Sequence, residues 1–235
     1  TFMGYKAGHG GTTSAPYSSG TNNVAVGYQA LTAFTTGGSN VTIGYRSGLD
    51  LTTGNYNTFL GRESGFEVTT NEGSVFLGYQ AGKNTKGAYH YNIAVGMQAL
   101  SDVHTQSGTV AIGYKSLEKV TSGAGNTAVG YYALADIATG GLNTVLGYEA
   151  GSKLGAGESQ NVIIGYEAMA DADEGTGSGN EIDNNIAIGY QSLTMGDFGS
   201  TGSRVARRII AIGSYALNST GTNSNTGTIA IGYEA

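Results

Sequence analysis

Cysteine is absent from the 235 residues, and proline occurs once, at Pro16. Without cysteine the chain has no disulfide, no thiolate nucleophile and no zinc–thiolate site. The single proline excludes a proline-rich triple helix, and the glycines do not fall at every third position. No run approaches 18 apolar residues and no charged start leads into an apolar stretch, so we expect neither a membrane span nor a signal peptide.

Charge is also scarce, at 12% of the residues, and its balance is acidic. The net charge of −6 gives no reason to expect nucleic acid or an anionic membrane as partner, because phosphate binding needs clustered cations. The one short basic cluster is Arg204, Arg207 and Arg208, which we expect to pair with nearby acids. His9, His90 and His104 occupy unrelated positions, so we expect solvated histidines rather than a metal site.

Motifs of known catalytic chemistry are missing as well. The chain has no HExxH, no phosphate loop, no G-x-S-x-G and no calcium-binding nonapeptide repeat. The nearest acidic cluster, Asp171, Asp173, Glu174, Glu181 and Asp183, lies in one glycine-rich segment, a poor place to hold the two carboxylates of a glycosidase. We therefore expect no enzyme, no catalytic residue and no cofactor, while weak cation binding by this segment stays open.

Glycine is abundant, with 41 residues, and one glycine recurs at a regular interval. The basic period is 17 residues, which is too short for helical-hairpin repeats or propeller blades and fits one coil of a parallel β-solenoid. The thirteen anchor glycines are Gly4, Gly27, Gly44, Gly61, Gly78, Gly96, Gly113, Gly130, Gly147, Gly165, Gly189, Gly213 and Gly232.

Three positions before each anchor form a short strand. The third residue before the anchor is always Thr, Val or Ile, and the residue directly before it is always aliphatic. Side chains in a strand alternate between two faces, so these two columns share one face. We expect that face to be the interior of the coil.

The column between them, two residues before the anchor, should then be polar if it faced water, yet it is apolar apart from Thr42. A strand that is apolar on both faces is buried on both faces, which predicts a contact with another copy of the chain. The candidate interface residues are Ala25, Phe59, Phe76, Ala94, Ala111, Ala128, Val145, Ile163, Ala187, Ala211 and Ala230.

The columns outside the strand also repeat. Tyrosine follows the anchor in most units, and only Ala or Ser stands two positions later. The anchor glycine is expected to permit a bend or a close approach between coils. Asparagine precedes the strand in many units, including Asn40, Asn57 and Asn143, and we expect stacked asparagines to bond to each other and to turn backbone.

The units NVAVGYQAL, NIAVGMQAL, NTAVGYYAL and NNIAIGYQSL resemble the repeats in the head of YadA-type trimeric autotransporter adhesins. They are also similar to Gly/Asn-rich repeats of trimeric phage tail fibres and related bacterial surface fibres. The resemblance covers nearly the whole chain and implies a left-handed β-roll in a homotrimer. The chain departs from the adhesin heads in its longer, 17-residue unit, and it contains neither a coiled-coil stalk nor a C-terminal barrel. We expect one β-roll domain over residues 1–235, as a segment of a longer fibre.

Three units are longer than the rest, through inserts at 8–22, 170–184 and 194–208. Such inserts are typical of binding loops displayed from a scaffold. We predict that the acidic second insert pairs electrostatically with the basic third. The exposed aromatics could stack on sugars or pack over a neighbouring turn. The candidate ligand-binding residues are Tyr17, Tyr89, Tyr91, Asp171, Asp173, Glu174, Phe198, Arg204, Arg207 and Arg208.

These features bear on three possible functions. Loop inserts favour an extracellular adhesive or receptor-binding fibre, on a bacterial surface or a phage virion, with a glycan or protein receptor bound by three copies of each weak site. A smooth rod would instead favour a purely structural shaft, which stays the alternative. Ice binding needs a flat array of threonines, which the strand columns lack.

Overall fold

The computed structural model describes residues 1–11, 18–85, 90–102, 106–155, 157–171, 181–194, 205–218 and 225–235. Within these ranges the chain is all-β and contains no helix. Six of the candidate ligand-binding residues lie outside the described residues, namely Tyr17, Tyr89, Asp173, Glu174, Phe198 and Arg204. The chain divides into two compact units, residues 1–115 and 116–235. Whether the repeats form a single domain stays a prediction.

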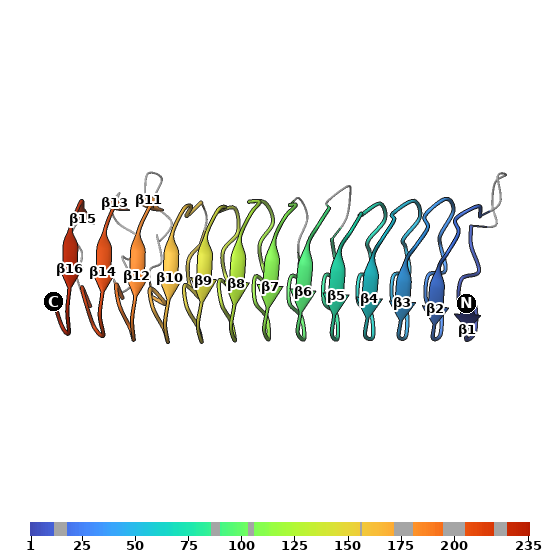
Figure 1. Cartoon of the computed structure of the whole chain (residues 1–235), viewed down its shortest axis with the longest axis horizontal. Coiled ribbons are helices and arrows are strands. Elements are labelled where there is room, and N and C mark those ends of the chain that lie inside the picture. Colours follow the sequence, from blue (N-terminus) through green and yellow to red (C-terminus); the bar gives the residue numbers. More distant parts are fainter. Residues whose placement is uncertain are drawn as a thin grey trace. The chain divides into compact units, whose positions relative to one another are not determined.

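Unit 1 is a β-solenoid in which each coil contributes one short strand (Figure 1). Every strand pairs in parallel with the next one along the chain, so that Val41 faces Thr58 and Thr58 faces Val75. This confirms the predicted fold class and the register set by the anchor glycines. The strands are β1 (Phe2–Met3), β2 (Val24–Val26), β3 (Val41–Ile43), β4 (Thr58–Leu60), β5 (Val75–Leu77), β6 (Ile93–Val95) and β7 (Val110–Ile112).

Unit 2 repeats this ladder and adds a second, smaller parallel sheet (Figure 1). Its main strands are β8 (Thr127–Val129), β9 (Thr144–Leu146), β10 (Val162–Ile164), β12 (Ile186–Ile188), β14 (Ile210–Ile212) and β16 (Ile229–Ile231). The second sheet contains β11 (Glu181–Asp183), β13 (Val205–Arg207) and β15 (Asn225–Thr226). The ends of the second and third inserts are therefore strands and not loops, because the two inserts have equal length and return to the coil in register.

The expected orientation of the strands is wrong. The middle column, which we expected at an interface between chains, is the interior of the coil. Ala25, Phe59, Phe76, Ala94, Ala111, Ala128, Ala187, Ala211 and Ile163 are 0% exposed in the single chain, and Val145 and Ala230 are also buried. These residues cannot touch a partner, and the two flanking aliphatic columns face outward instead.

The interior is filled by two positions that compensate in size. Where the middle residue is alanine, as at Ala25 and Ala128, a buried leucine stands six residues later, at Leu31 and Leu134. Where it is Phe59, that later position is Gly65, at which an added Cβ would lie 2.7 Å from the Phe59 ring. In these coils one large side chain fills the interior at this level, and either position can supply it.

Two expected stabilising features are confirmed. Asn57 donates from Nδ2 to Asn40 Oδ1 (3.0 Å) and to the backbone oxygen of Asn71 (2.7 Å), so buried asparagines stack and also hold a turn. The same pattern recurs in unit 2, for example at Asn143. At the anchor Gly44, whose φ is 137°, an added Cβ would lie 2.3 Å from the backbone oxygen of Gly61. Only glycine permits this approach between coils.

Candidate functional site: the strand face and the tyrosine ladder

The outward side of the main strands is an uncharged, largely aliphatic surface, which we call the strand face. In each coil it comprises the third residue and the last residue before the anchor glycine. Leu60 and Leu146 are 46% and 50% exposed although they stand in the middle of their ladders. In unit 1 the strand face consists of Thr1, Met3, Val24, Val26, Val41, Ile43, Thr58, Leu60, Val75, Leu77, Ile93, Val95, Val110 and Ile112. In unit 2 it consists of Thr127, Val129, Thr144, Leu146, Val162, Ile164, Ile186, Ile188, Ile210, Ile212, Ile229 and Ile231.

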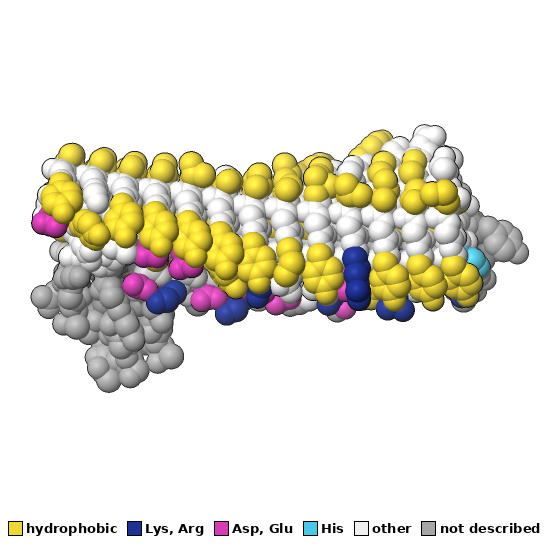
Figure 2. Space-filling view, turned by 90° about the horizontal axis from the view of Figure 1, so that it is seen from below, with side chains coloured by type: hydrophobic (Ala, Val, Ile, Leu, Met, Phe, Trp, Pro, Cys, Tyr) yellow, Lys and Arg dark blue, Asp and Glu magenta, His cyan; other side chains and the backbone are white. Residues whose placement is uncertain are grey.

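The area of the strand face follows from the spacing and length of its strands. The seven strands are about 4.8 Å apart and each is about 10 Å long, which gives the strand face of unit 1 an area of roughly 300 Å². A largely apolar patch of that size, interrupted only by Thr1 and Thr58, is comparable to the largest patch on a typical monomeric protein, and such patches are often functional. Figure 2 shows a row of apolar side chains along one edge of the view in each unit. The strand face therefore has the character of an interaction surface.

A second exposed row follows the anchor glycines and is separated from the strand face by backbone. We call it the tyrosine ladder: Tyr5, Tyr28 and Tyr45 in unit 1, and Tyr131, Tyr148, Tyr166 and Tyr190 in unit 2. Neighbouring rings stack with centroids 4.9–5.3 Å apart and with interplanar angles of 5–18°. The ring row is visible in Figure 2. Because each ring covers the face of the next, the ladder presents ring edges and hydroxyl groups to solvent.

The ladder is interrupted in unit 1, where Arg62 occupies the tyrosine position. Its guanidinium lies 5.3 Å from the ring centroid of Tyr45 and 5.8 Å from that of Tyr79. A planar cation can replace an aromatic ring in such a stack through cation–π attraction. Met97 stands at the tyrosine position in the coil after that of Tyr79. Tyr79 therefore lies between Arg62 and Met97 and has no tyrosine on either side of it in the row.

Carboxylates border the ladder in unit 2. Hydrogen bonding with Glu167 raises the pKa of the Tyr166 phenol to about 12, and desolvation adds to the shift. The pKa of Tyr148 is raised in the same way, first by hydrogen bonding with Glu149. Each of these phenols therefore has a proton acceptor beside it.

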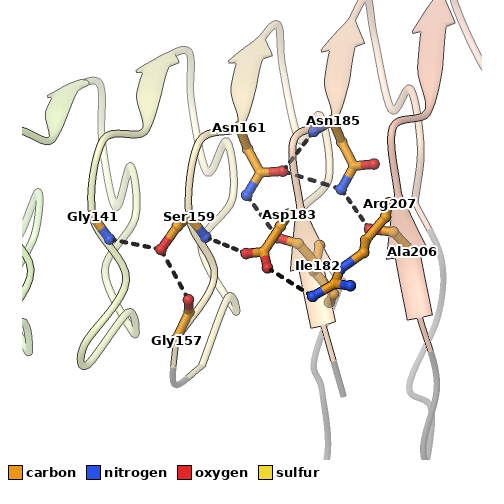
Figure 3. A network of polar contacts seen from close by, with 9 residues as sticks. All are labelled: Gly141, Gly157, Ser159, Asn161, Ile182, Asp183, Asn185, Ala206 and Arg207. Carbon is orange, nitrogen blue, oxygen red and sulfur yellow. Dashed lines mark hydrogen bonds and ion pairs between the residues drawn. The ribbon is translucent and has the colours of Figure 1, made fainter. Parts of the chain in front are cut away.

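The predicted pairing between the second and third inserts is confirmed. Arg207 Nη2 lies 3.7 Å from Asp183 Oδ2, and Asp183 Oδ1 accepts a 2.7 Å hydrogen bond from the backbone N–H of Ser159 (Figure 3). Asn161 and Asn185 donate to the backbone oxygens of Ile182 and Ala206, both at 2.8 Å. The asparagine stack and this ion pair fasten the second sheet to the coil, which is a structural role.

The other described candidates from the sequence do not form a common site. Tyr91 is 64% exposed, and its ring lies over Gly73 of the preceding coil, where an added Cβ would be 2.9 Å away. This is the packing over a neighbouring turn that was the alternative to sugar stacking. Asp171 pairs with Lys153. Arg208 has a left-handed backbone conformation, with φ 56°, and donates its N–H to the backbone oxygen of Asp183 at 3.3 Å.

Concave or metal-binding features are weak. Within the ranges that the structure describes, no three His, Asp or Glu residues gather in a group that could hold a metal ion. The part of the chain with assigned structure also contains no helix long and apolar enough to cross a membrane. A shallow depression of about 230 Å³ is lined by Tyr132, Ala135, Asp136, Glu149, Ser152 and Lys153. Its Lys153 and Asp136 are already paired with Asp171 and Lys119.

Comparisons of the chain with models of protein families, with curated proteins and with solved structures find no match. The case for function therefore rests on the strand face, the tyrosine ladder and the inserts.

Proposed function

We propose that the chain is a segment of an extracellular fibre in which three copies pack side by side along their strand faces. The observation that carries this proposal is the strand face itself, which is largely aliphatic, contains no charged residue and is half-buried to exposed in the single chain. At about 25 cal/mol per Å², covering roughly 300 Å² of apolar surface in unit 1 stabilises an assembly by about 7 kcal/mol before association costs.

Other copies of the same chain are the partners that fit this surface best. Within each unit the coils present similar side chains at the same spacing, so two copies of a unit in register match coil by coil. Closed symmetric assemblies of identical chains are the commonest way to cover such a patch. The number three comes from the resemblance to trimeric adhesin heads and tail fibres.

Within this fibre we assign adhesion or receptor binding to the inserts, with a cell-surface glycan or protein as the target. Support comes from the anchoring of two inserts by the second sheet and by the Asp183–Arg207 pair, which is the construction expected of a displayed loop. Three copies of a weak site would act together. A purely structural shaft, without a receptor on this segment, stays the second candidate. The proposal includes no catalytic activity.

The assembly is tested by the mass of the purified protein in light scattering. Leu60→Lys places a charge in the middle of the strand face at a residue that is 46% exposed, so the chain still folds while assembly is lost. Thr53→Lys is the matched control, because Thr53 is exposed at the turn opposite the strand. We expect a mass near three chains for the wild type and for Thr53→Lys, and one chain for Leu60→Lys. A monomeric wild type would overturn the proposal.

A deletion variant distinguishes the adhesive function from the structural shaft. In this variant the insert at 194–208 is shortened so that its unit has 17 residues. We expect the shortened protein to keep its trimeric mass and to lose binding to target cells. Binding that is absent from the wild type as well would favour the shaft.

A further inference from the structure

The tyrosine ladder of unit 2 brings four exposed phenol rings into a regular stack. Centroid distances are 4.9 Å between Tyr131 and Tyr148, 5.2 Å between Tyr148 and Tyr166, and 5.2 Å between Tyr166 and Tyr190. The interplanar angles are only 5–6°. Parallel rings at this separation bring the carbons ortho to neighbouring hydroxyls close together. The rings are 41–43% exposed, so an oxidant can reach them and the side chains can rotate.

Phenol oxidation needs a place for the proton, and the ladder supplies one. When a tyrosine loses an electron its phenolic proton becomes strongly acidic, and a hydrogen-bonded carboxylate can take it. Glu149 and Glu167 adjoin the phenols of Tyr148 and Tyr166, the central pair of the stack, and raise the pKa of both. These two tyrosines therefore have both a stacked partner and an adjacent base.

We propose that the ladder of unit 2 is a site of oxidative dityrosine crosslinking, with the bond between Tyr148 and Tyr166 as its principal product. This modification goes beyond the proposed assembly and does not depend on it. The oxidant is a peroxide acting through a haem peroxidase. Each phenol gives up one electron and one proton, and one molecule of hydrogen peroxide takes up both electrons and both protons to form two molecules of water.

The two phenoxyl radicals then join through their ortho carbons. The hydrogens on the joined carbons transfer as protons to the two oxygens, which restores both phenols, so the protein loses two hydrogen atoms for each crosslink. The reaction is favoured because the second radical is held on the same chain, at an effective concentration of about mM or higher. The product ties adjacent coils covalently, and such a link opposes unwinding of a solenoid from within.

To test this, the folded protein is treated with a haem peroxidase and hydrogen peroxide, and it is then denatured and digested with trypsin. Cleavage after Lys119, Lys153 and Arg204 places Tyr148 in peptide 120–153 and Tyr166 in peptide 154–204. We expect the two peptides to be joined, with a mass two hydrogens below their sum and with dityrosine fluorescence. Protein unfolded in guanidinium before oxidation should lose this selectivity.

The variants separate the stacked ladder from general oxidation of exposed tyrosine. Tyr166→Phe keeps the ring but cannot form a phenoxyl radical, so the joined peptide is lost. Tyr79→Phe is the matched control, since Tyr79 is 39% exposed but lies between Arg62 and Met97 in the row. It should leave the joined peptide and the total dityrosine unchanged.

Two results would overturn the proposal. One is a folded wild type that yields no joined peptide, or yields no more of it than the unfolded protein does. The other comes from chains refolded as a mixture of ¹⁴N and ¹⁵N protein: if the joined peptides carry mixed labels in statistical proportion, the link forms between chains and not within the ladder.

Discussion

The compensation between the two interior positions makes a quantitative prediction about Phe59 and Gly65. Phe59→Ala removes a buried ring that stacks on Phe76, with centroids 4.9 Å apart, and it should lower the free energy of unfolding by about 3–5 kcal/mol. Gly65→Leu alone forces a side chain into the space of that ring, where even a Cβ would be 2.7 Å away. It should destabilise the protein by at least about 3 kcal/mol.

The double variant should be more stable than either single variant. Ala at 59 with Leu at 65 recreates the arrangement seen in the coil of Ala25 and Leu31. The leucine must adopt the left-handed conformation that Leu31 has, with φ 50°, at a cost of about 1–2 kcal/mol. The lost ring stacking adds roughly 1 kcal/mol. We therefore expect a net loss of about 2–3 kcal/mol, and a favourable coupling between the two positions of at least about 3 kcal/mol.

Urea unfolding followed by circular dichroism, at one fixed protein concentration, measures the three variants. Hydrogen exchange of the peptide that contains β4 locates the effect, because repeats can open locally. If the losses of the two single variants simply add in the double variant, the two side chains do not share one space, and the account of the interior is refuted.

Three further outcomes are expected. Asn57→Ala leaves buried backbone groups without partners and should lower the free energy of unfolding by about 3 kcal/mol in urea, while Asn55→Ala, at a half-buried turn, should cost less. Arg207→Ala breaks a partly exposed ion pair and should cost less than about 1 kcal/mol, with a smaller difference from wild type at high salt. The raised pKa of Tyr166, about 12, means that folded protein holds this proton more tightly than unfolded protein. Its stabilising contribution is therefore complete below pH 10 and is lost towards pH 12; in absorbance titration Glu167→Gln should lower this pKa.

The fold was predictable from the repeat because every unit carries the same pattern of residues. An invariant glycine, a β-branched residue three positions earlier and an asparagine before that define the period, the strand and the polar stack. The register follows, since aligning the glycines aligns the strands. The inserts at 170–184 and 194–208 were recognised, but their strand ends were not, because residues 181–183 and 205–207 do not resemble the core strand.

The direction of the strand faces could not be read from alternation, because both faces are apolar. Period two separates the faces but does not say which one is inside. The signal that identifies the inside is a correlation between two positions of the repeat. Alanine at the middle position of the strand occurs with leucine six residues later, as in Ala25 and Leu31. Phenylalanine at the middle position occurs with glycine six residues later, as in Phe59 and Gly65. Positions that compensate in size share a space. Three pairs depart from this rule, namely Thr42 and Gly48, Val145 and Gly151, and Ile163 and Met169.

This inversion also changes how the assembly has to be tested. Lysine at Ala111 or Ala128 would bury a charge in the coil interior and unfold the protein whether or not it assembles. The side chains that report on a partner are those of the strand face.

Carbene footprinting of the native protein at assembling concentration tests the central claim most directly, since it labels exposed side chains regardless of their chemistry. We expect Leu60 and Leu146, which are about half exposed in the single chain, to be protected, and Thr53 and Thr139 at the opposite turns to be labelled. In the Leu60→Lys variant the protection of Leu146 should be lost together with the trimeric mass. Labelling of Leu60 and Leu146 in the wild type, at the level set by their exposure in the single chain, would contradict the claim that the strand face is covered by other copies.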